Sequence, residues 1–305
     1  MGNTYDGIIL IDKEEGMTSF DVVKAIRRLL KVKKVGHAGT LDPFATGLLI
    51  ILLGQGTKLS NYLMAGDKFY QATMRLGVET DTQDLTGCVV KRCLVPEFEP
   101  EFIRKVAHRF VGEIEQVPPL FSAVNYRGKR AYKLARKGIK MDLQKRSVKV
   151  HSLAITSIDL PDVSMKVTCS RGTYVRSLAA DLGRELGPGG HLKSLRRFRS
   201  GPFSVKDALS IKNMEHLSRD RIMSKSIIAL HKALPDMNEA KVEGSLAQRI
   251  RNGHQPGYDE VSMADLPRSF QGYMKLVEGE GLVAIAKAQP LVESKASLKI
   301  MRVFN

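Results

Sequence analysis

The sequence predicts a mixed α/β (α+β) fold with a central mixed or antiparallel sheet, followed by a small β-rich module. Two observations support this fold class. Alternating apolar residues, typical of strands, and apolar residues spaced three or four apart, typical of helices, intermix without a regular βαβ rhythm. After about residue 230 the pattern changes to short strands separated by tight turns. We therefore expect one domain over residues 1–232 and a second over residues 233–305.

The N-terminal part predicts two strands with a helix between them. Residues 7–11 form a short apolar strand, and residues 48–53 are a continuous apolar run, short enough for a strand covered on both faces. Between them, Thr18 and Asp21 have the spacing of a capping box. The helix that follows has an apolar face of Val22, Val23, Ile26, Leu29 and Leu30. Its other face, with Lys24, Arg27, Arg28 and Lys31, is either solvated or meets an anionic partner.

The middle of the chain adds two strands and two helices. Residues 68–77 alternate as a strand, which places Tyr70 on the same face as its apolar neighbours. Residues 101–111 predict an amphipathic helix capped by Gly112. That helix packs through Phe102, Ile103, Val106 and Phe110. Residues 163–169 alternate as another strand, and residues 175–186 carry the apolar stripe of a helix.

The C-terminal module predicts a short helix and three strands. The helix covers residues 246–250 and ends before Asn252-Gly253. The strands are residues 273–278, 282–287 and 298–304, with a tight turn at Gly279-Glu280-Gly281.

Composition limits the possible partners and compartments. The formal net charge of +16 indicates an anionic partner, either nucleic acid or an anionic membrane surface. No apolar stretch reaches the length of a transmembrane helix, and residues 1–12 lack the pattern of a signal peptide. Cys88, Cys93 and Cys169 have no metal-ligand spacing. We therefore expect a cytoplasmic protein with reduced cysteines and no metal site.

Residues 36–47 contain the most informative motif, which reads GHAGTLDPFATG. Its single carboxylate, Asp42, lies among glycines and a proline in a predicted loop before the buried strand. A carboxylate in a shaped loop at the edge of a core can serve as a nucleophile or general base. It can equally form an Asx-turn before Pro43. The residues alone leave both interpretations open.

The order of these residues closely resembles the signature of the bacterial tRNA pseudouridine-55 synthases, the TruB-like family. The resemblance covers residues from about 5 to 210. It includes DKEEGMTS at residues 12–19, GQGTKL at 54–59, DKFY at 67–70, TDTQD at 80–84, PPLFSA at 118–123 and CSRGTYVR at 169–176. It implies a stand-alone, cofactor-free enzyme that flips the uridine at position 55 of the tRNA T-loop and isomerises it to pseudouridine. The C-terminal module resembles the PUA-type RNA-binding fold.

The resemblance also assigns roles to individual residues. Asp42 matches the catalytic aspartate, which would attack C1′, attack C6 or act as the base that forms a glycal. Tyr70 matches an active-site tyrosine that moves a proton or stacks on the uracil, and Arg176 matches the arginine that pairs with the aspartate. Further matched positions would contact substrate: His37, Lys58, Tyr174 and Leu195. We interpret Asp81 and Asp84 as turn-forming carboxylates rather than metal ligands.

A basic segment at residues 124–150 is the candidate RNA-binding surface. Between Tyr126 and Val150 there are ten lysines and arginines and one acid, Asp142. The segment has too few apolar residues to bury itself well, so we expect it to be mobile without a partner. In the resembled family it is an insertion that folds over the RNA loop like a thumb. Its candidate phosphate contacts are Arg127, Lys129, Arg130 and Lys133.

Two rival functions share parts of this pattern. One is the catalytic subunit of a guide-RNA-directed pseudouridylation complex, whose core motif is similar. The other is a non-catalytic RNA-binding or RNA-folding protein, which the intact set of Asp42, Tyr70 and Arg176 disfavours. The basic insertion favours the stand-alone enzyme. We expect it to bind the T-arm stem-loop of tRNA as a monomer, with no membrane and no obligate protein partner.

Overall fold

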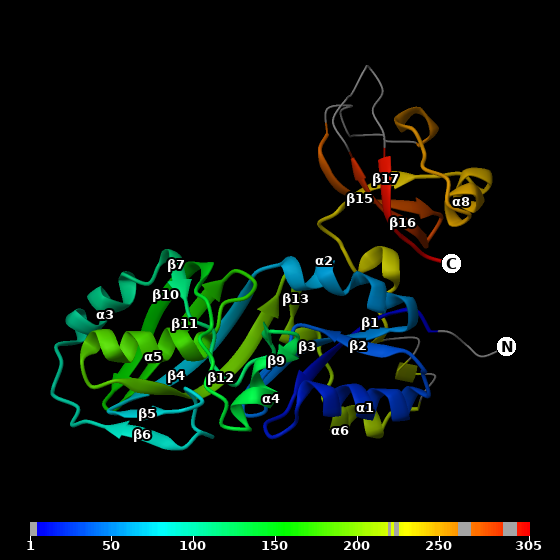
Figure 1. The fold of residues 1–305 in the computed structure, drawn as a ribbon. Coiled ribbons are helices and arrows are strands. Elements are labelled where there is room, and N and C mark those ends of the chain that lie inside the picture. The colour runs from blue at the N-terminus through cyan, green and yellow to red at the C-terminus, as the bar shows by residue number, and fades with distance from the viewer. Residues whose placement is uncertain (1–4, 219–220, 223–225, 262–269, 289–297) are drawn as a thin grey trace.

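The computed structural model describes residues 5–218, 221–222, 226–261, 270–288 and 298–305. A large domain with a central sheet carries a small module above one end of the sheet (Figure 1). The first four residues of the segment considered for a signal peptide lie outside the described part. Within the described residues no helix is long and apolar enough to cross a membrane.

The central sheet is mixed, as predicted. Its main path runs β1-β3-β12-β4-β11-β10-β7, with β2 paired to β3 and β13 paired to β12. Neighbouring strands are antiparallel except for β12 and β3, which are parallel. The strands are β1 (Gly7–Lys13), β2 (Val35–Ala38), β3 (Thr46–Leu53), β4 (Lys68–Leu76), β7 (Gly112–Gln116), β10 (Arg146–Asp159), β11 (Asp162–Cys169), β12 (Gly190–Ser200) and β13 (Phe203–Ser204).

Two apolar cores lie on opposite faces of this sheet. Alternation along β1 divides its side chains between them: Ile9 and Ile11 face one core, and Ile8 and Leu10 face the other. Residues of four helices cover the first face, namely α1 (Ser19–Leu30), α3 (Pro100–His108), α5 (Val175–Leu186) and α6 (Ile211–Glu215). Residues of α2 (Ser60–Ala65) and of the C-terminal module cover part of the second. The capping box of α1 is confirmed, because Thr18 and Asp21 bond reciprocally.

Short elements connect the sheet to its loops. The β5–β6 hairpin pairs Val78–Thr80 with Val89–Arg92. Four 3₁₀ turns complete the described chain: η1 (Gly54–Leu59), η2 (Val205–Asp207), η3 (Leu230–Lys232) and η4 (Tyr258–Glu260).

The C-terminal module contains the predicted helix and strands. Its sheet has the order β14-β15-β16-β17. The elements are β14 (Asn238–Lys241), α8 (Gly244–Arg251), β15 (Gly272–Glu278), β16 (Gly281–Ala288) and β17 (Leu298–Val303). The sequence did not predict β14, a short strand parallel to β15. The module shares a core with the large domain, because Val277, Ile285 and Phe304 cluster with the second face of β1 and β3.

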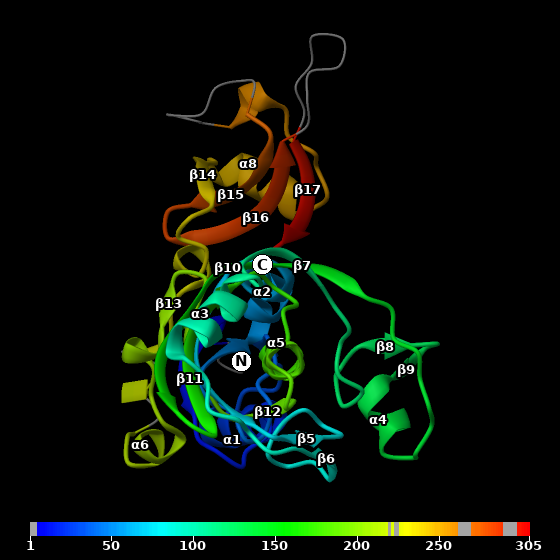
Figure 2. The same ribbon diagram turned by 90° about the vertical axis from the view of Figure 1, so that its left-hand side faces the viewer.

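The basic insertion forms a separate small lobe, which stands away from the body in Figure 2. It contains β8 (Asn125–Tyr126), β9 (Lys129–Arg130) and α4 (Ala131–Ala135). The expectation that this segment buries little of itself is wrong in part, because Val124, Ala131 and Leu143 form a small core. Its predicted end at residue 150 is also wrong. Residues 146–150 belong to β10, whose alternating Val148 and Val150 are buried against the sheet.

Three local predictions are corrected by the structure. Residues 36–38, predicted as loop, form part of β2, because their backbone pairs with β3. Phe102, predicted in the core, is 45% exposed on α3. That helix ends at His108, and Gly112 instead begins β7 with a φ of 112°.

Candidate active site

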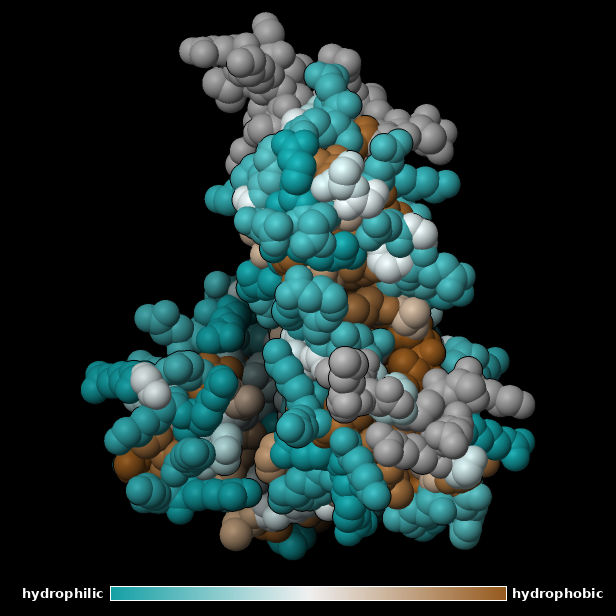
Figure 3. Space-filling model, turned by 90° about the vertical axis from the view of Figure 1, so that its right-hand side faces the viewer, coloured by the Kyte–Doolittle hydropathy of each residue, from teal (hydrophilic) through white to brown (hydrophobic). Residues whose placement is uncertain are grey.

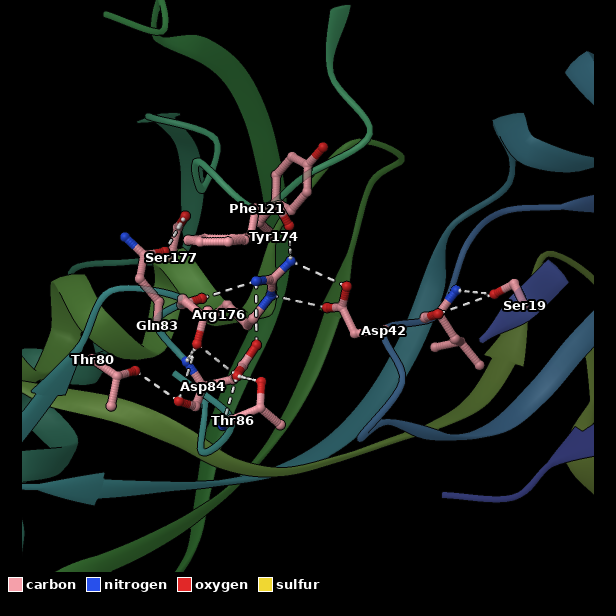
Figure 4. A network of polar contacts seen from close by, with 12 residues as sticks. Ser19, Asp42, Thr80, Gln83, Asp84, Thr86, Phe121, Tyr174, Arg176 and Ser177 are labelled. Atoms are coloured by element: carbon pink, nitrogen blue, oxygen red, sulfur yellow. Dashed lines mark hydrogen bonds and ion pairs between the residues drawn. The ribbon is translucent and has the colours of Figure 1, made fainter. Parts of the chain in front are cut away.

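Asp42 lies in a loop between β2 and β3 that is tied down on both sides. The Ser19 hydroxyl accepts the Leu41 N–H at 2.8 Å and donates to the Leu41 carbonyl at 3.0 Å (Figure 4). On the other side, the Gly16 N–H donates to the Pro43 carbonyl at 2.8 Å. The Ala45 N–H closes a turn on the Asp42 carbonyl. This turn is made by the backbone and is not the Asx-turn considered from sequence, because both carboxylate oxygens of Asp42 lie against Arg176.

Arg176 faces Asp42 from the first turn of α5. Its Nη2 donates to Asp42 Oδ1 at 3.1 Å, and its Nε lies 2.9 Å from Oδ2, so the pair is bidentate. The Arg176 side chain is only 4% exposed, whereas that of Asp42 is 30% exposed. The guanidinium is therefore part of the core, and the carboxylate is the part of the pair that solvent and substrate can reach.

Asp84 is a second acidic partner of Arg176 that sequence reasoning missed. Arg176 Nη1 lies 3.3 Å from Asp84 Oδ2 and donates to the Thr82 carbonyl at 2.9 Å. Asp84 also has the predicted turn-forming role, because its Oδ1 accepts the Thr86 N–H and the hydroxyls of Thr82 and Thr86. Figure 4 shows the guanidinium between the two carboxylates. The TDTQD segment at residues 80–84 was the available sequence signal.

The same guanidinium reaches the base of the insertion. Arg176 Nη2 donates to the Phe121 carbonyl at 3.0 Å. Tyr174, just before α5, packs its side chain against the small core of the lobe. Its backbone exchanges two hydrogen bonds with the Gln116 side chain. The Asp42–Arg176 pair and the insertion lobe are thus joined through two residues at the start of one helix.

Opposing effects act on the charge of Asp42. Burial raises the pKa of Asp42, and the neighbouring Asp84 carboxylate raises it further. Arg176 and Lys13 act in the opposite direction by stabilising the ionised form. A desolvated carboxylate held by a guanidinium is a stronger nucleophile and base than a solvated one, yet it keeps a defined orientation.

Lys13 is a buried cation near Asp42 that the sequence did not single out. Its Nζ donates to the carbonyls of Met17 at 2.8 Å, Glu14 at 2.9 Å and Pro43 at 3.1 Å. Burial lowers the pKa of Lys13 to about 8, although the Asp42 charge opposes this effect. Lys13 therefore holds the Asp42 loop in place through three backbone carbonyls.

Tyr70 lies in β4, directly between Val167 of β11 and Arg197 of β12 in the strand register. It is 8% exposed, and burial raises its pKa, whereas the nearby Arg197 guanidinium lowers it. The resting phenol is therefore protonated at neutral pH. Arg197, also missed from sequence, donates its Nε to the Leu48 carbonyl at 2.7 Å and its Nη2 to the Gly39 carbonyl at 3.1 Å.

His37 and Leu195 lie close to this centre. His37 is half-buried on β2, and burial together with the Arg197 charge lowers its pKa, so the ring is neutral at physiological pH. Leu195, on β12, is buried in the same core as Tyr70. Both positions are compatible with the substrate contacts predicted for them.

Lys58 is the predicted site residue that the structure places elsewhere. Its Nζ donates to the Gln55 side chain at 2.9 Å and to the Val303 carbonyl at 2.6 Å. It also lies 5.3 Å from the centre of the Phe304 ring. Its nearest charges are Lys34, Asp6 and Arg302, not Asp42. Lys58 thus joins η1 to the C-terminal module, and Lys13 is the lysine near the Asp42 carboxylate.

The insertion lobe faces the body across a hollow, which is visible in the space-filling view (Figure 3). Lys129, Arg130 and Lys133 line a cavity of about 330 Å³ within the lobe, together with Lys137. Arg127 is the fourth predicted contact, and its guanidinium lies over the Tyr126 ring at 5.4 Å. All four predicted cations are exposed.

Within the described residues, no three His, Cys, Asp or Glu side chains gather in a way that could hold a metal ion. Cys88, Cys93 and Cys169 are free thiols, and only Cys169 is buried.

Comparison with known proteins gives a consistent result. Residues 27–175 match the TruB family pseudouridylate synthase (N terminal domain), and residues 176–240 match the tRNA pseudouridylate synthase B C-terminal domain. The chain is 41% identical to tRNA pseudouridine synthase B of Geotalea uraniireducens over 98% of both chains. It is 46% identical to that of Clostridium kluyveri over 81% of this chain and 84% of the relative.

Solved structures show the same fold. A chain in a crystal structure of a Cbf5-Nop10-Gar1 complex superimposes with a TM-score of 0.74 at 27% identity, covering 99% of this chain and 86% of that one. A chain in the structure of an H/ACA RNP bound to a substrate RNA containing 2′-deoxyuridine gives 0.73 at 25% identity, with the same coverage.

Proposed function

The chain belongs to the TruB family of pseudouridylate synthases, and from this premise we propose that it isomerises the uridine at position 55 of the tRNA T-loop. It would act alone, as a monomer in the cytoplasm, and without a cofactor. The reaction breaks the bond between C1′ and N1, turns the uracil and joins it to C1′ through C5. It needs a group that acts on carbon, a way to remove the C5 proton and a pocket that retains the free base.

The bidentate pair of Asp42 and Arg176 is the observation that supports this proposal best. The carboxylate is the exposed partner of an otherwise buried ion pair, so it can reach a flipped nucleotide while Arg176 keeps it ionised. Attack at C1′, attack at C6 and formation of a glycal all start from this ionised Asp42. Trapping the intermediate with a 5-fluorouridine T-arm would distinguish these routes.

Tyr70 completes the chemistry in this proposal. Its ring is suited to stacking on the uracil, and its hydroxyl lies in a buried environment beside Arg197. Because the phenol is protonated at rest, it would accept the C5 proton only if its own proton is transferred onward. His37 would fill the space left in the T-loop stack, and Leu195 would line the pocket. Neither role requires His37 to be charged.

The insertion lobe would supply the energy for base flipping. Unstacking a nucleotide costs a few kcal/mol. The cations of the lobe, at residues 127, 129, 130 and 133, would supply this energy through phosphate contacts across the hollow in Figure 3. The C-terminal module, over residues 233–305, would add a PUA-like RNA contact.

A second candidate function is that of a subunit in a guide-RNA-directed complex, because the fold matches a chain from a Cbf5-Nop10-Gar1 complex. The insertion favours the stand-alone enzyme, since it gives this chain its own RNA grip. A non-catalytic RNA-binding protein would not need an accessible carboxylate held in place by a buried guanidinium.

One assay separates the three. Purified protein alone, with an unmodified tRNA labelled with tritium at uridine C5, should release tritium from the T-loop uridine. The reaction should also proceed in excess EDTA on a T-arm hairpin that is stable without magnesium. Release only after addition of other proteins or a guide RNA would support the complex, and RNA binding without release would support the non-catalytic protein.

A further inference from the structure

A hollow of about 370 Å³ lies on the sheet face opposite the catalytic residues. Six residues line it: Phe69, Thr168, Phe198, Arg199, Ser204 and Lys206. Along β4 the side chains alternate, so Tyr70 faces the core beneath α5 and Phe69 faces the other way. A cavity of this volume lies within the range of small-ligand clefts, about 300–1,000 Å³.

The hollow is built by the strand register rather than by loops. Thr168 of β11 pairs with Phe69 of β4, Phe69 pairs with Arg199 of β12, and Arg199 pairs with Ser204 of β13. Directly paired residues point to the same face, so the four side chains form one row across four strands. Phe198 lies beside the row at a shift in the register, with its ring 6.0 Å from that of Phe69 and tilted by 50°.

The chemistry of the row combines aromatic faces with free positive charge. Arg199 and Lys206 are exposed, and neither makes an ion pair with any described residue. The Arg196 guanidinium lies 5.4 Å from the Phe198 ring centre, where Asp12 holds it with two hydrogen bonds of 3.0 and 2.7 Å. The Phe198 ring is therefore fixed on one side and half-exposed to solvent.

The position of the hollow is also informative. Phe198 packs at the edge of the second apolar core, the part of this face that α2 and the C-terminal module cover. The hollow thus lies where the covering ends and the open part of the sheet begins, beside the elements that join the two modules.

We propose that this hollow binds an unpaired nucleotide of RNA, as a second contact away from the site around Asp42. The base would stack on Phe69 and Phe198, and the adjoining phosphates would meet Arg199 and Lys206. Aromatic side chains beside cations bind single-stranded RNA without strong sequence preference, because every base has a π-face. The proposal rests on the proposed function only in taking RNA as the ligand.

A tryptophan reporter tests the stacking directly, since the chain contains no tryptophan. In Phe198→Trp, an unstructured RNA of about 12 nucleotides should quench the single tryptophan in a saturable and salt-sensitive way. The matched control is Phe102→Trp, an exposed position on α3 over the other face of the sheet, which should not be quenched. RNA that binds by anisotropy without quenching Trp at position 198, or that quenches both reporters equally, would overturn the proposal.

A charge variant gives a second, independent readout. Arg199→Gln with Lys206→Gln should weaken binding of full-length tRNA about ten-fold and reduce the salt slope by roughly 0.7 to 0.9 per lost contact. The control is Arg104→Gln with Lys105→Gln on α3, which removes equal charge and should change neither. If both double variants lost the same affinity for tRNA, the effect would come from net charge alone and the proposed site would be wrong.

Wild-type turnover on a T-arm hairpin keeps this test separate from the proposed function. The Arg199/Lys206 double variant should retain that turnover, because the hairpin would contact the site around Asp42 and not the hollow. If the wild type fails to turn the hairpin over while Trp at position 198 is still quenched, the proposed function fails and the second site stands.

Discussion

The catalytic centre and the insertion lobe would both meet the RNA, yet they are built in opposite ways. Around Asp42, cations are buried and each is fixed by carboxylates or carbonyl oxygens, as Arg176 and Lys13 are. In the lobe, the cations are exposed on a small core of Val124, Ala131 and Leu143. The buried cations hold the groups around Asp42 in a defined geometry, but burying them costs desolvation free energy. The exposed cations of the lobe would contribute affinity for RNA, and salt would screen that contribution. Turnover and binding should therefore respond to different mutations.

The largest expected effect is on turnover alone. Asp42→Asn keeps the shape of the side chain but removes its charge, so the single-turnover rate should fall by at least about a thousand-fold. Affinity for tRNA should stay within a few-fold, because it comes mainly from phosphate contacts. Tritium release and filter binding measure the two quantities. Asp81→Asn, in the neighbouring turn, is the control and should retain activity. A tenth of the wild-type rate in Asp42→Asn would exclude Asp42 as the catalytic group.

Tyr70 tests whether the buried centre contributes proton transfer as well as shape. If the hydroxyl transfers the C5 proton, Tyr70→Phe should lose about 10² to 10⁴-fold in single-turnover rate, the usual contribution of acid–base catalysis. Tyr70→Leu should lose more, because it also removes the stacking ring. A silent Phe variant with a damaged Leu variant would refute proton transfer and leave stacking as the only role.

The lobe should show the reverse pattern. Neutralising Arg127, Lys129, Arg130 and Lys133 together should weaken tRNA binding and reduce the salt slope by roughly 0.7 to 0.9 for each lost phosphate contact. The rate at saturating RNA should fall far less than in Asp42→Asn, through the lost contribution to base flipping. Thermal stability should be nearly unchanged, because the small core contains none of these charges. An unchanged salt slope would mean that the lobe does not hold phosphates. Unfolding of the free protein would mean that the charges are structural.

The smallest expected effect is a change of the single-turnover rate with pH, and it concerns the buried cation Lys13. As the pH rises through about 8, the Lys13 ammonium loses its proton. The neutral amine then has two N–H donors for the three carbonyls of Met17, Glu14 and Pro43, and its charge no longer stabilises ionised Asp42. The single-turnover rate should therefore decrease a few-fold across this range, whereas Lys13→Met should start lower and show no such decrease. The same decrease in Lys13→Met would assign it to another group.

Local patterns allowed much of the fold to be predicted. The capping box of α1 and the alternation of β4 depend on neighbours in sequence, and both are confirmed. By contrast, β12 was not predicted because it carries Arg197 into the core, which hides the apolar alternation. β10 begins inside the most basic stretch of the chain, where composition suggested only a polar loop.

The site was only partly predictable for a similar reason. The loop motif identified Asp42, and the family resemblance supplied its partner Arg176. Asp84 and Lys13 come close to this pair only in the folded chain, and the motifs that contain them gave no indication of that contact. Lys58 shows the converse error: its position in a motif suggested the active site, but its ammonium binds the carbonyl of Val303.

The apolar core shared by the two modules has a consequence for synthesis on the ribosome. Ile8 and Leu10 are made long before Val277, Ile285 and Phe304, which belong to the same core. Translation proceeds from the N-terminus at about 5–20 residues per second, so the part of this face that the C-terminal module covers stays uncovered until that module has been made. During that interval the nascent chain exposes an apolar sheet surface, which is the kind of surface that chaperones bind. A ribosome stalled before residue 304 would hold a chain that contains Asp42 and Arg176 but lacks Phe304, a buried member of this core.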